Sequence, residues 1–243
     1  MADRPRVLPC PSVHRHAAGA PSTVPRVRRW LCTTGAFLVA IAALWHRWVT
    51  PWHERWGATD AEARGGLPGD GLVPEPAQQV TRATTIDAAP DDVWPWIVQL
   101  GADRGGFYSY EWLENLFGLG IHNADEVVPQ WQRRSVGDLV LADAAGSYGW
   151  YVMEVRPADT LVLQVADVRA GRPIRRDEQL RWEFSWSFVL RPAPGRRCRL
   201  LVRERTGFGS RLTEVAMSPV GIVSFVMTRQ MLRGIKARAE GRR

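Results

Sequence analysis

The stretch from residue 137 to residue 208 alternates between apolar and polar residues with a period of two, and this feature constrains the fold most strongly. Turn sequences such as Arg-Pro-Ala-Asp (156–159) and Pro-Ala-Pro-Gly (192–195) separate the alternating runs. The runs are residues 137–143, 149–155, 160–167, 181–191 and 197–208. Short alternating runs joined by tight turns are typical of an antiparallel meander. The sequence therefore predicts an antiparallel sheet over this part of the chain.

One strand and two helices are predicted upstream of this sheet. Residues 81–87 alternate well enough for a strand. Pro90, followed by two aspartates in the first turn, opens a helix that ends near Gly101. A second, shorter helix is predicted over residues 110–117.

The C-terminal region predicts one long helix. Ser218 is a favourable N-cap and Pro219 suits the first helical position, so the helix is expected from there to about Glu240. Its apolar residues fall on one face, at Val220, Val223, Met227, Met231 and Ile235. The order of elements is a strand, two helices, the meander and this helix, which is an α+β fold.

Composition and charge divide the chain into four parts. Residues 1–29 are rich in Pro, Arg, Ala and Ser and are predicted to be a disordered basic tail. Residues 30–49 are hydrophobic, residues 50–79 predict a Gly/Pro-rich linker or wrapping arm, and residues 80–243 predict the folded domain. The net charge is +7, yet residues 80–228 carry 17 basic and 18 acidic side chains. Because the excess lies at the chain ends, the charge argues against nucleic-acid binding and favours an anionic membrane surface.

The hydrophobic segment at residues 30–49 predicts a membrane anchor. Its uncharged core is 15 residues long, and with the flanking residues it reaches roughly the 20 residues that span a bilayer. Trp30, Trp45 and Trp48 lie at its ends, where interfacial aromatic residues are found. One alternative is a signal peptide, although the bulky residues after the run argue against cleavage. The other is an interfacial segment or an extension that results from a wrongly assigned start of the chain. We expect a single-pass membrane protein, and arginines on both sides leave its orientation open.

No metal or cofactor is predicted. Cys10, Cys32 and Cys198 have no paired spacing, so neither a disulfide framework nor a zinc site is indicated. Four of the five histidines precede the folded domain. The Gly-Gly pair after Arg104 lacks the strand and helix that flank a phosphate loop.

Several local motifs sharpen the fold prediction. The sequences VWPWIVQLG (93–101), RGGFYSYEWLENLFG (104–118) and IHNAD (121–125) follow WGATDAEA (56–63), LPGDGLVPEP (67–76) and TRATTIDA (81–88). Together they resemble a bacterial subgroup of the START-like superfamily SRPBCC, which contains polyketide cyclase/dehydrase and lipid-transfer domains. The resemblance covers about residues 52–240 and implies a helix-grip fold, in which a curved antiparallel sheet wraps a long C-terminal helix and leaves a ligand chamber between them. It implies no particular activity, because the same scaffold carries binders, transporters and enzymes.

The strand patterns predict an apolar inner wall for this chamber. Alternating residues from Trp182 to Phe188 share one face of their strand, while Glu183, Ser185 and Ser187 share the other. In the next strand the arginine-bearing face is expected to be the solvated one. The residues expected to contact a ligand are Trp182, Phe184, Trp186, Phe188, Leu200, Val202, Glu204, Tyr108, Tyr110, Val223, Met227 and Met231. The alternative is that the aromatic side chains fill a solid core.

Three residues are weak candidates for catalysis. Glu204 is predicted to point inward, where its charge needs a partner such as an arginine, unless it reaches solvent at a strand end. His122 could act as a general base held by Asp125, or make only a structural hydrogen bond. His122 and Asp125 belong to a polar segment that is expected near the mouth of the cavity. The polar residues of this segment are Asp103, Arg104, Tyr108, Tyr110, Glu114, His122, Asn123 and Asp125.

Three functions remain open at this level. The leading hypothesis is non-catalytic, membrane-associated binding or transfer of a lipid-like or polyketide-like small molecule. The second is a polyketide cyclase or dehydratase, which needs an acid/base pair that converges on the cavity. The third is an envelope interaction protein with a vestigial cavity. An open apolar cavity favours the first hypothesis, polar groups grouped inside it favour the second, and a filled core favours the third.

Overall fold

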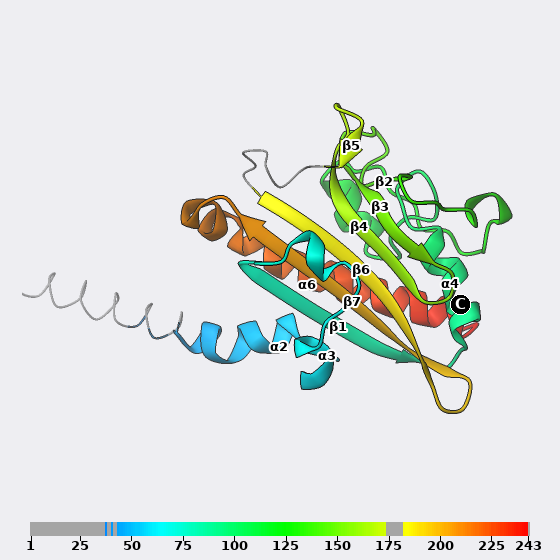
Figure 1. Ribbon diagram of the computed structural model, residues 1–243, viewed down its shortest axis with the longest axis horizontal. Coiled ribbons are helices and arrows are strands. Elements are labelled where there is room, and N and C mark those ends of the chain that lie inside the picture. Colours follow the sequence, from blue (N-terminus) through cyan, green and yellow to red (C-terminus); the bar gives the residue numbers. More distant parts are fainter. Residues whose placement is uncertain (1–36, 38–39, 41–42, 174–181, 243) are drawn as a thin grey trace, which may run out of the picture. The chain divides into compact units, whose positions relative to one another are not determined.

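A computed structural model describes residues 37, 40, 43–173 and 182–242 (Figure 1). The chain divides into two compact units, Met1–Arg47 and Trp48–Arg243. The predicted tail at residues 1–29 and most of the predicted anchor at residues 30–49 lie outside the described residues. A π-helical turn, η1 (Trp45–Val49), leads into the first helix of the second unit.

The second unit contains the elements that follow η1. In chain order they are α2 (Thr50–Glu54), α3 (Asp60–Arg64), η2 (Asp70–Leu72), β1 (Gln78–Ile86), α4 (Pro90–Val98), α5 (Glu111–Leu116), η3 (Pro129–Trp131), β2 (Leu139–Leu141), β3 (Gly149–Arg156), β4 (Thr160–Asp167), β5 (Arg172–Pro173), β6 (Trp182–Ala193), β7 (Arg197–Phe208) and α6 (Arg211–Ala239). The strands and helices predicted for residues 80–243 are present, with boundaries shifted by a few residues except at the start of α6.

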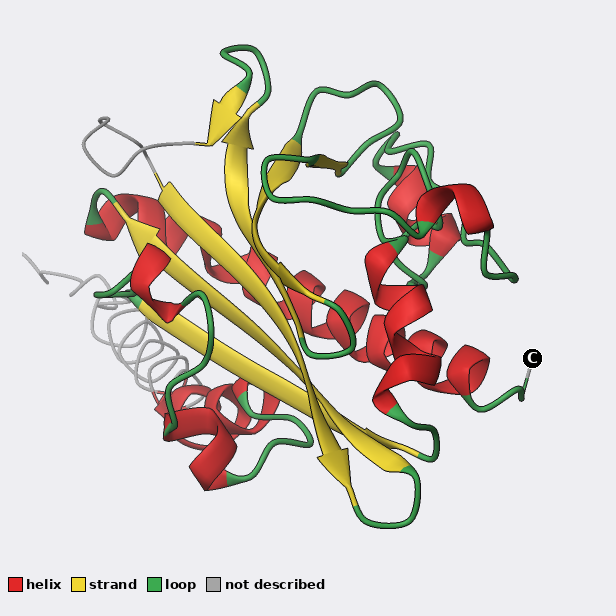
Figure 2. Cartoon of the chain, turned by 45° about the vertical axis from the view of Figure 1, so that its right-hand side comes forward, coloured by secondary structure: helices red, strands yellow, loops and turns green. Residues whose placement is uncertain are grey.

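The strands form one antiparallel sheet in the order β1-β7-β6-β4-β3-β2, with the short β5 paired to β4. The 12-residue strands β6 and β7 form the longest hairpin and pair along their whole length. In Figure 2 the sheet curves around α6, which runs along one of its faces. The antiparallel sheet and the long C-terminal helix are those of a helix-grip fold, as predicted.

The inner face of the sheet and α6 enclose the main core. Trp186 and Phe188 of β6 belong to the same buried cluster as Met231, Leu232 and Ile235 of α6. The predicted orientation of β6 is therefore confirmed: its aromatic face packs toward the helix. Each large apolar side chain buried in this way stabilises the fold by about 1.5–3 kcal/mol.

The outer face of the sheet is covered by the arm (residues 57–74), which contradicts the expectation of a solvated arginine face. Arg203 is 1% exposed. Its guanidinium donates to the carbonyl oxygens of Glu62, Ala63 and Gly65 and to the carboxylate of Asp70. The last carbonyl groups of a helix lack partners within the helix, and the fork of an arginine can satisfy several of them at once. The arginine face is therefore an attachment surface for the arm.

Two further contacts fasten the arm. Arg199 binds both carboxylate oxygens of Glu62 at 2.8 Å, and this hydrogen bonding lowers the pKa of Glu62 to about 2. Ser187 of β6 donates to the carbonyl oxygen of Pro68 at 2.8 Å, so the polar face of β6 points away from α6. A small apolar cluster lies beneath the arm, made by Leu67, Ala83, Val189 and Leu201.

The start of α6 also differs from the prediction. The helix begins at Arg211 rather than after Ser218, and the hydroxyl of Ser210 caps it by accepting from the Thr213 amide at 3.2 Å. Pro219 is inside the helix, where it lacks the N–H group for a helical hydrogen bond. The parts Arg211–Met217 and Pro219–Ala239 accordingly meet at a bend of 48°. Among the described residues no single helix has the length and apolar composition to cross a membrane, and only these two parts together meet both criteria.

Candidate functional site

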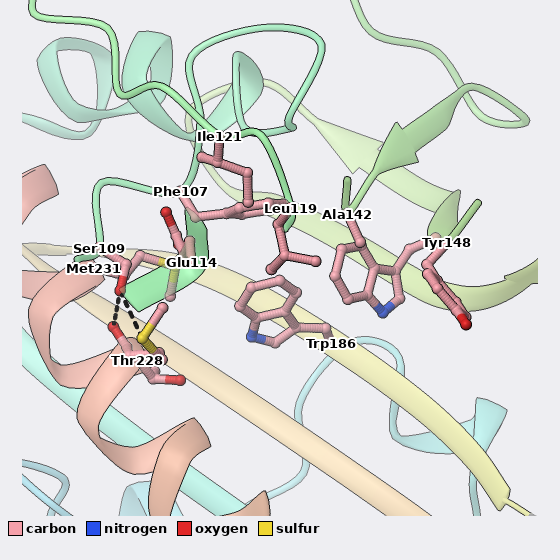
Figure 3. A pocket seen from close by; sticks show the side chains of 12 residues that line it. Phe107, Ser109, Glu114, Leu119, Ile121, Ala142, Tyr148, Trp186, Thr228 and Met231 are labelled. Atoms are coloured by element: carbon pink, nitrogen blue, oxygen red, sulfur yellow. Dashed lines mark hydrogen bonds between the residues drawn. The ribbon is translucent and has the colours of Figure 1, made fainter. Parts of the chain in front are cut away.

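A cavity of about 300 Å³ lies between the inner face of the sheet, α6 and the segment that contains α5 (Figure 3). Its lining residues are Phe107, Ser109, Glu114, Leu119, Ile121, Ala142, Tyr148, Trp150, Trp186, Met227, Thr228 and Met231. Figure 3 shows Trp186 in the middle of the wall, with Glu114 and Met231 to one side and Ala142 and Tyr148 to the other. Tyr148 is 70% exposed, so the cavity opens to solvent beside it.

Three aromatic rings form the principal wall. The ring centroids of Trp150 and Trp186 are 5.3 Å apart, and Phe107 lies 5.9 Å from Trp150 and 6.1 Å from Trp186. The indole Nε1 atoms of both tryptophans are buried and have no hydrogen-bond partner among the described residues. Buried indole N–H groups usually have a partner. Both donors are therefore unused, and they lie beneath the surface of the wall.

Two hydroxyl groups of the lining are already engaged with the protein. Ser109 Oγ donates to the carbonyl oxygen of Met227 at 3.2 Å. Thr228 Oγ1 donates to Glu204 Oε1 at 2.8 Å. Each hydroxyl has a single proton, so towards the cavity these groups can act only as acceptors.

Glu114 is the ionisable residue of the lining whose protonation changes near neutral pH. It lies in α5 and is only 3% exposed, and its Oε2 has no hydrogen-bond partner in the part of the chain that the structure describes. Burial, and to a lesser degree the nearby carboxylate of Glu111, raise the pKa of Glu114 to about 7. A carboxyl group with this pKa can accept a hydrogen bond, donate one or bind a cation near neutral pH.

No clear signal in the sequence indicates this role of Glu114. Helix α5 exposes the apolar side chains of Trp112 and Leu116, and Phe117 directly after the helix is exposed as well. The buried residue of the helix is Glu114. A helix that followed the usual pattern would bury the apolar face and expose the charge. The only hint was the position of Glu114 in the polar segment near the expected mouth.

The predicted ligand contacts are divided between the cavity and its surroundings. Trp186, Met227 and Met231 line the cavity. Phe188, Leu200, Val202 and Tyr108 are buried in the adjoining core, with Phe184 packed against it. Trp182, Tyr110 and Val223 are outside the lining, and Val223 is exposed on α6.

Tyr108 serves the core rather than the cavity. Its hydroxyl oxygen accepts from Gln99 at 2.9 Å, and the guanidinium carbon of Arg238 lies 4.6 Å from its ring centroid. Burial raises the pKa of Tyr108. Gly234 of α6 lies directly against this residue, where any Cβ atom would overlap the Tyr108 carbonyl oxygen.

Glu204 points inward and has the predicted arginine partner. Its Oε1 accepts from Arg82 at 3.0 Å and from Thr228 at 2.8 Å, and its Oε2 accepts from Ser224 at 2.7 Å. Arg82 lies on β1 and the two hydroxyl groups lie on α6, so the carboxylate ties the helix to the sheet. Glu204 itself does not line the cavity; Thr228 lies between them.

The other two catalytic candidates lie outside the cavity lining. The side chain of His122 is 85% exposed, with its Nδ1 3.9 Å from Glu111. Asp125 accepts from Arg238 at 2.9 Å. Acid/base chemistry in the cavity would require a side chain within hydrogen-bond reach of the ligand, and neither residue lines the cavity.

Comparisons with protein families and with curated proteins find no match. Solved structures that resemble the chain include a Thermobifida fusca protein, with 14% identity, a TM-score of 0.43 and coverage of 68% of this chain and 93% of that one. An Arthrobacter aurescens protein has 17% identity, a TM-score of 0.40 and coverages of 68% and 87%. CalU16 from Micromonospora echinospora has 13% identity, a TM-score of 0.31 and coverages of 67% and 84%. These scores carry no argument about function, and the fold assignment rests on the strand order and α6.

Proposed function

We propose that this protein binds a hydrophobic small molecule in the cavity between the sheet and α6, as a member of the SRPBCC superfamily. The cavity itself is the observation that carries the proposal, because small-molecule sites are concave, mostly apolar and supplied with a few polar groups. A cavity of 150 Å³ holds benzene, so 300 Å³ has room for about a dozen non-hydrogen atoms. Larger ligands would extend through the opening beside Tyr148.

The distribution of polar groups favours binding over catalysis. Glu204 is saturated by three donors, and His122 and Asp125 are outside the lining. Glu114 alone supplies a group that changes protonation near neutral pH, whereas a cyclase or dehydratase needs an acid and a base. An enzyme that uses Glu114 is the second candidate. In that case Glu114→Gln would abolish turnover while the substrate still binds.

A filled core would have favoured an interaction protein with a vestigial cavity. Glu114 argues against that interpretation, because it lines the cavity and its buried Oε2 has no hydrogen-bond partner among the described residues, which costs free energy. A ligand with matching groups would remove this cost.

We further propose that residues 30–49 attach the protein to a membrane. The uncharged run, the tryptophans at its ends and the basic chain ends support this. Fractionation of cells that express the full chain or a chain that starts at Pro51 tests it. The full chain is expected in the membrane fraction and the shortened chain in the soluble fraction; equal distribution of the two would contradict the proposal.

Native mass spectrometry of the full chain tests ligand binding. The detergent-solubilised protein is expected to release a bound hydrophobic molecule, which is then identified. Ala142→Phe places a large side chain in the cavity and should abolish the bound mass, whereas Ala145→Phe, at an exposed position of the same turn, should retain it. A ligand-free wild-type protein, or equal retention by both variants, would contradict the proposal.

A further inference from the structure

The cavity contains one carboxyl group whose charge no described residue neutralises. Glu114 Oε2 is buried without a hydrogen-bond partner among those residues. The neighbouring charge that acts on Glu114 is Glu111, which is also negative. A buried carboxylate with only a like charge beside it is unstable unless a cation or a proton compensates it.

The remaining lining is also suited to a positive group. Ser109 and Thr228 present only oxygen lone pairs to the cavity, because their protons are donated to the protein. The faces of Phe107, Trp150 and Trp186 attract cations through their ring quadrupoles. None of the arginine and lysine residues that the structure describes lines the cavity, so an anionic ligand would find no counter-charge among them.

The two indole N–H groups of the aromatic wall have no acceptor among the described residues. Both belong to the aromatic wall formed by Trp150 and Trp186, and both are buried. Because each indole Nε1 atom exposes almost no surface, these donors select no group on a ligand. Glu114 is therefore the residue of the described lining that selects a positive group.

We propose that the ligand is an amphiphilic amine, whose apolar body lies against the aromatic wall and whose protonated amino group binds the Glu114 carboxylate. The inference rests on the proposed function, because it specifies the class of molecule that the same cavity takes. Fatty acids are expected to bind more weakly above pH 7, because their carboxylate would then face the Glu114 carboxylate and no described lining residue supplies a counter-charge.

Three ligands of matched shape test the head-group preference. 4-Phenylbutylamine, 4-phenylbutanol and 4-phenylbutyrate differ only at one end, and each has about a dozen non-hydrogen atoms, the number estimated from the cavity volume. The full chain in phosphatidylcholine nanodiscs is titrated by calorimetry at pH 8, with empty nanodiscs as the baseline. The amine is expected to bind about tenfold or more tightly than the alcohol, as a charge-assisted contact in a buried site implies, and the acid most weakly.

The variant Glu114→Gln should remove the preference for the amine, so that the amine and the alcohol bind with similar affinity. Glu111→Gln makes the same change of charge one turn away, outside the lining, and should keep the preference. If Glu114→Gln fails to fold, as judged by circular dichroism, Glu114→Met replaces the buried polar group with an apolar one and carries the same test.

Equal binding of the three ligands to the wild type, tighter binding of the acid, or an amine preference that survives in Glu114→Gln would overturn the inference. Loss of all binding in Ala142→Phe would then show that the cavity is still the binding site, so the proposed function would stand without the amine. Failure of all three ligands to bind the wild type would also overturn the inference, and the native mass spectrum would decide the proposed function separately.

Discussion

Replacing Glu114 with glutamine should change how the stability of the protein depends on pH. The pKa of this carboxyl group is about 7 in the folded protein, against an ordinary value of 4.5, because burial disfavours its charged form. Between these two values the folded state holds a proton that the unfolded state releases. The resulting stabilisation is fully present below pH 4.5 and is lost as the pH rises through 7.

The magnitude follows from the two pKa values. A rise from 4.5 to about 7 corresponds to about 3 kcal/mol of free energy, of which on the order of 2.5 kcal/mol is lost between pH 5 and pH 8. A glutamine at this position does not titrate, so it lacks this loss. Relative to the wild type, Glu114→Gln should therefore become more stable by about 2.5 kcal/mol as the pH rises from 5 to 8.

Urea unfolding monitored by circular dichroism at pH 5, 6, 7 and 8 measures this difference. Any cost of the glutamine that does not depend on pH cancels when the values at two pH values are compared. Glu111→Gln is the matched comparison. It removes a more exposed carboxyl group that makes the smaller contribution to the raised pKa of Glu114, so its difference from the wild type should change by much less than that of Glu114→Gln. A difference between Glu114→Gln and wild type that stays constant over this range would refute the reasoning.

Three other substitutions test the contacts that hold the fold together. Glu204→Ala should lower the free energy of unfolding by about 3–5 kcal/mol, because it leaves Arg82 buried without its counter-charge, while Glu204→Gln should cost less. Arg203→Ala should release the arm (residues 57–74), which limited proteolysis would detect as faster cleavage there; exposed Arg197→Ala is the control. Gly234→Ala should destabilise the protein by about 1–3 kcal/mol in thermal unfolding, because its Cβ atom overlaps the Tyr108 carbonyl oxygen.

The sheet could be predicted because apolar and polar residues alternate along its strands, and this alternation decides which face of the sheet is buried. The inner face of β6 from Phe184 to Phe188 is apolar, and a shift of one residue would have placed serines against α6. The outer face could not be predicted from the same pattern. An arginine such as Arg203 is typical of a solvated surface, and its burial depends on carbonyl groups of the arm more than 130 residues earlier in the chain.

Local signals also misplaced the start of α6 and overlooked Glu114. Ser218-Pro219 has the sequence of a helix start, yet the preceding turns remain helical because Ser210 provides a cap and the proline only bends the helix. In the sequence Glu114 resembles a surface residue, because the short helix α5 reverses the usual pattern and exposes apolar side chains to solvent. Its burial is decided by the cavity wall, whose residues come from α6 and three other parts of the chain.

The central claim is that a hydrophobic molecule occupies the cavity, and the methionine methyl groups test it most directly. Met227 and Met231 line the cavity, whereas Met153 and Met217 do not. In a protein with ¹³C-labelled methionine methyl groups, titration with the neutral probe 4-phenylbutanol should shift the signals of Met227 and Met231 and leave the other two in place. The shifts should be absent in Ala142→Phe. Unchanged signals from Met227 and Met231, or equal shifts at all four methionines, would contradict the account.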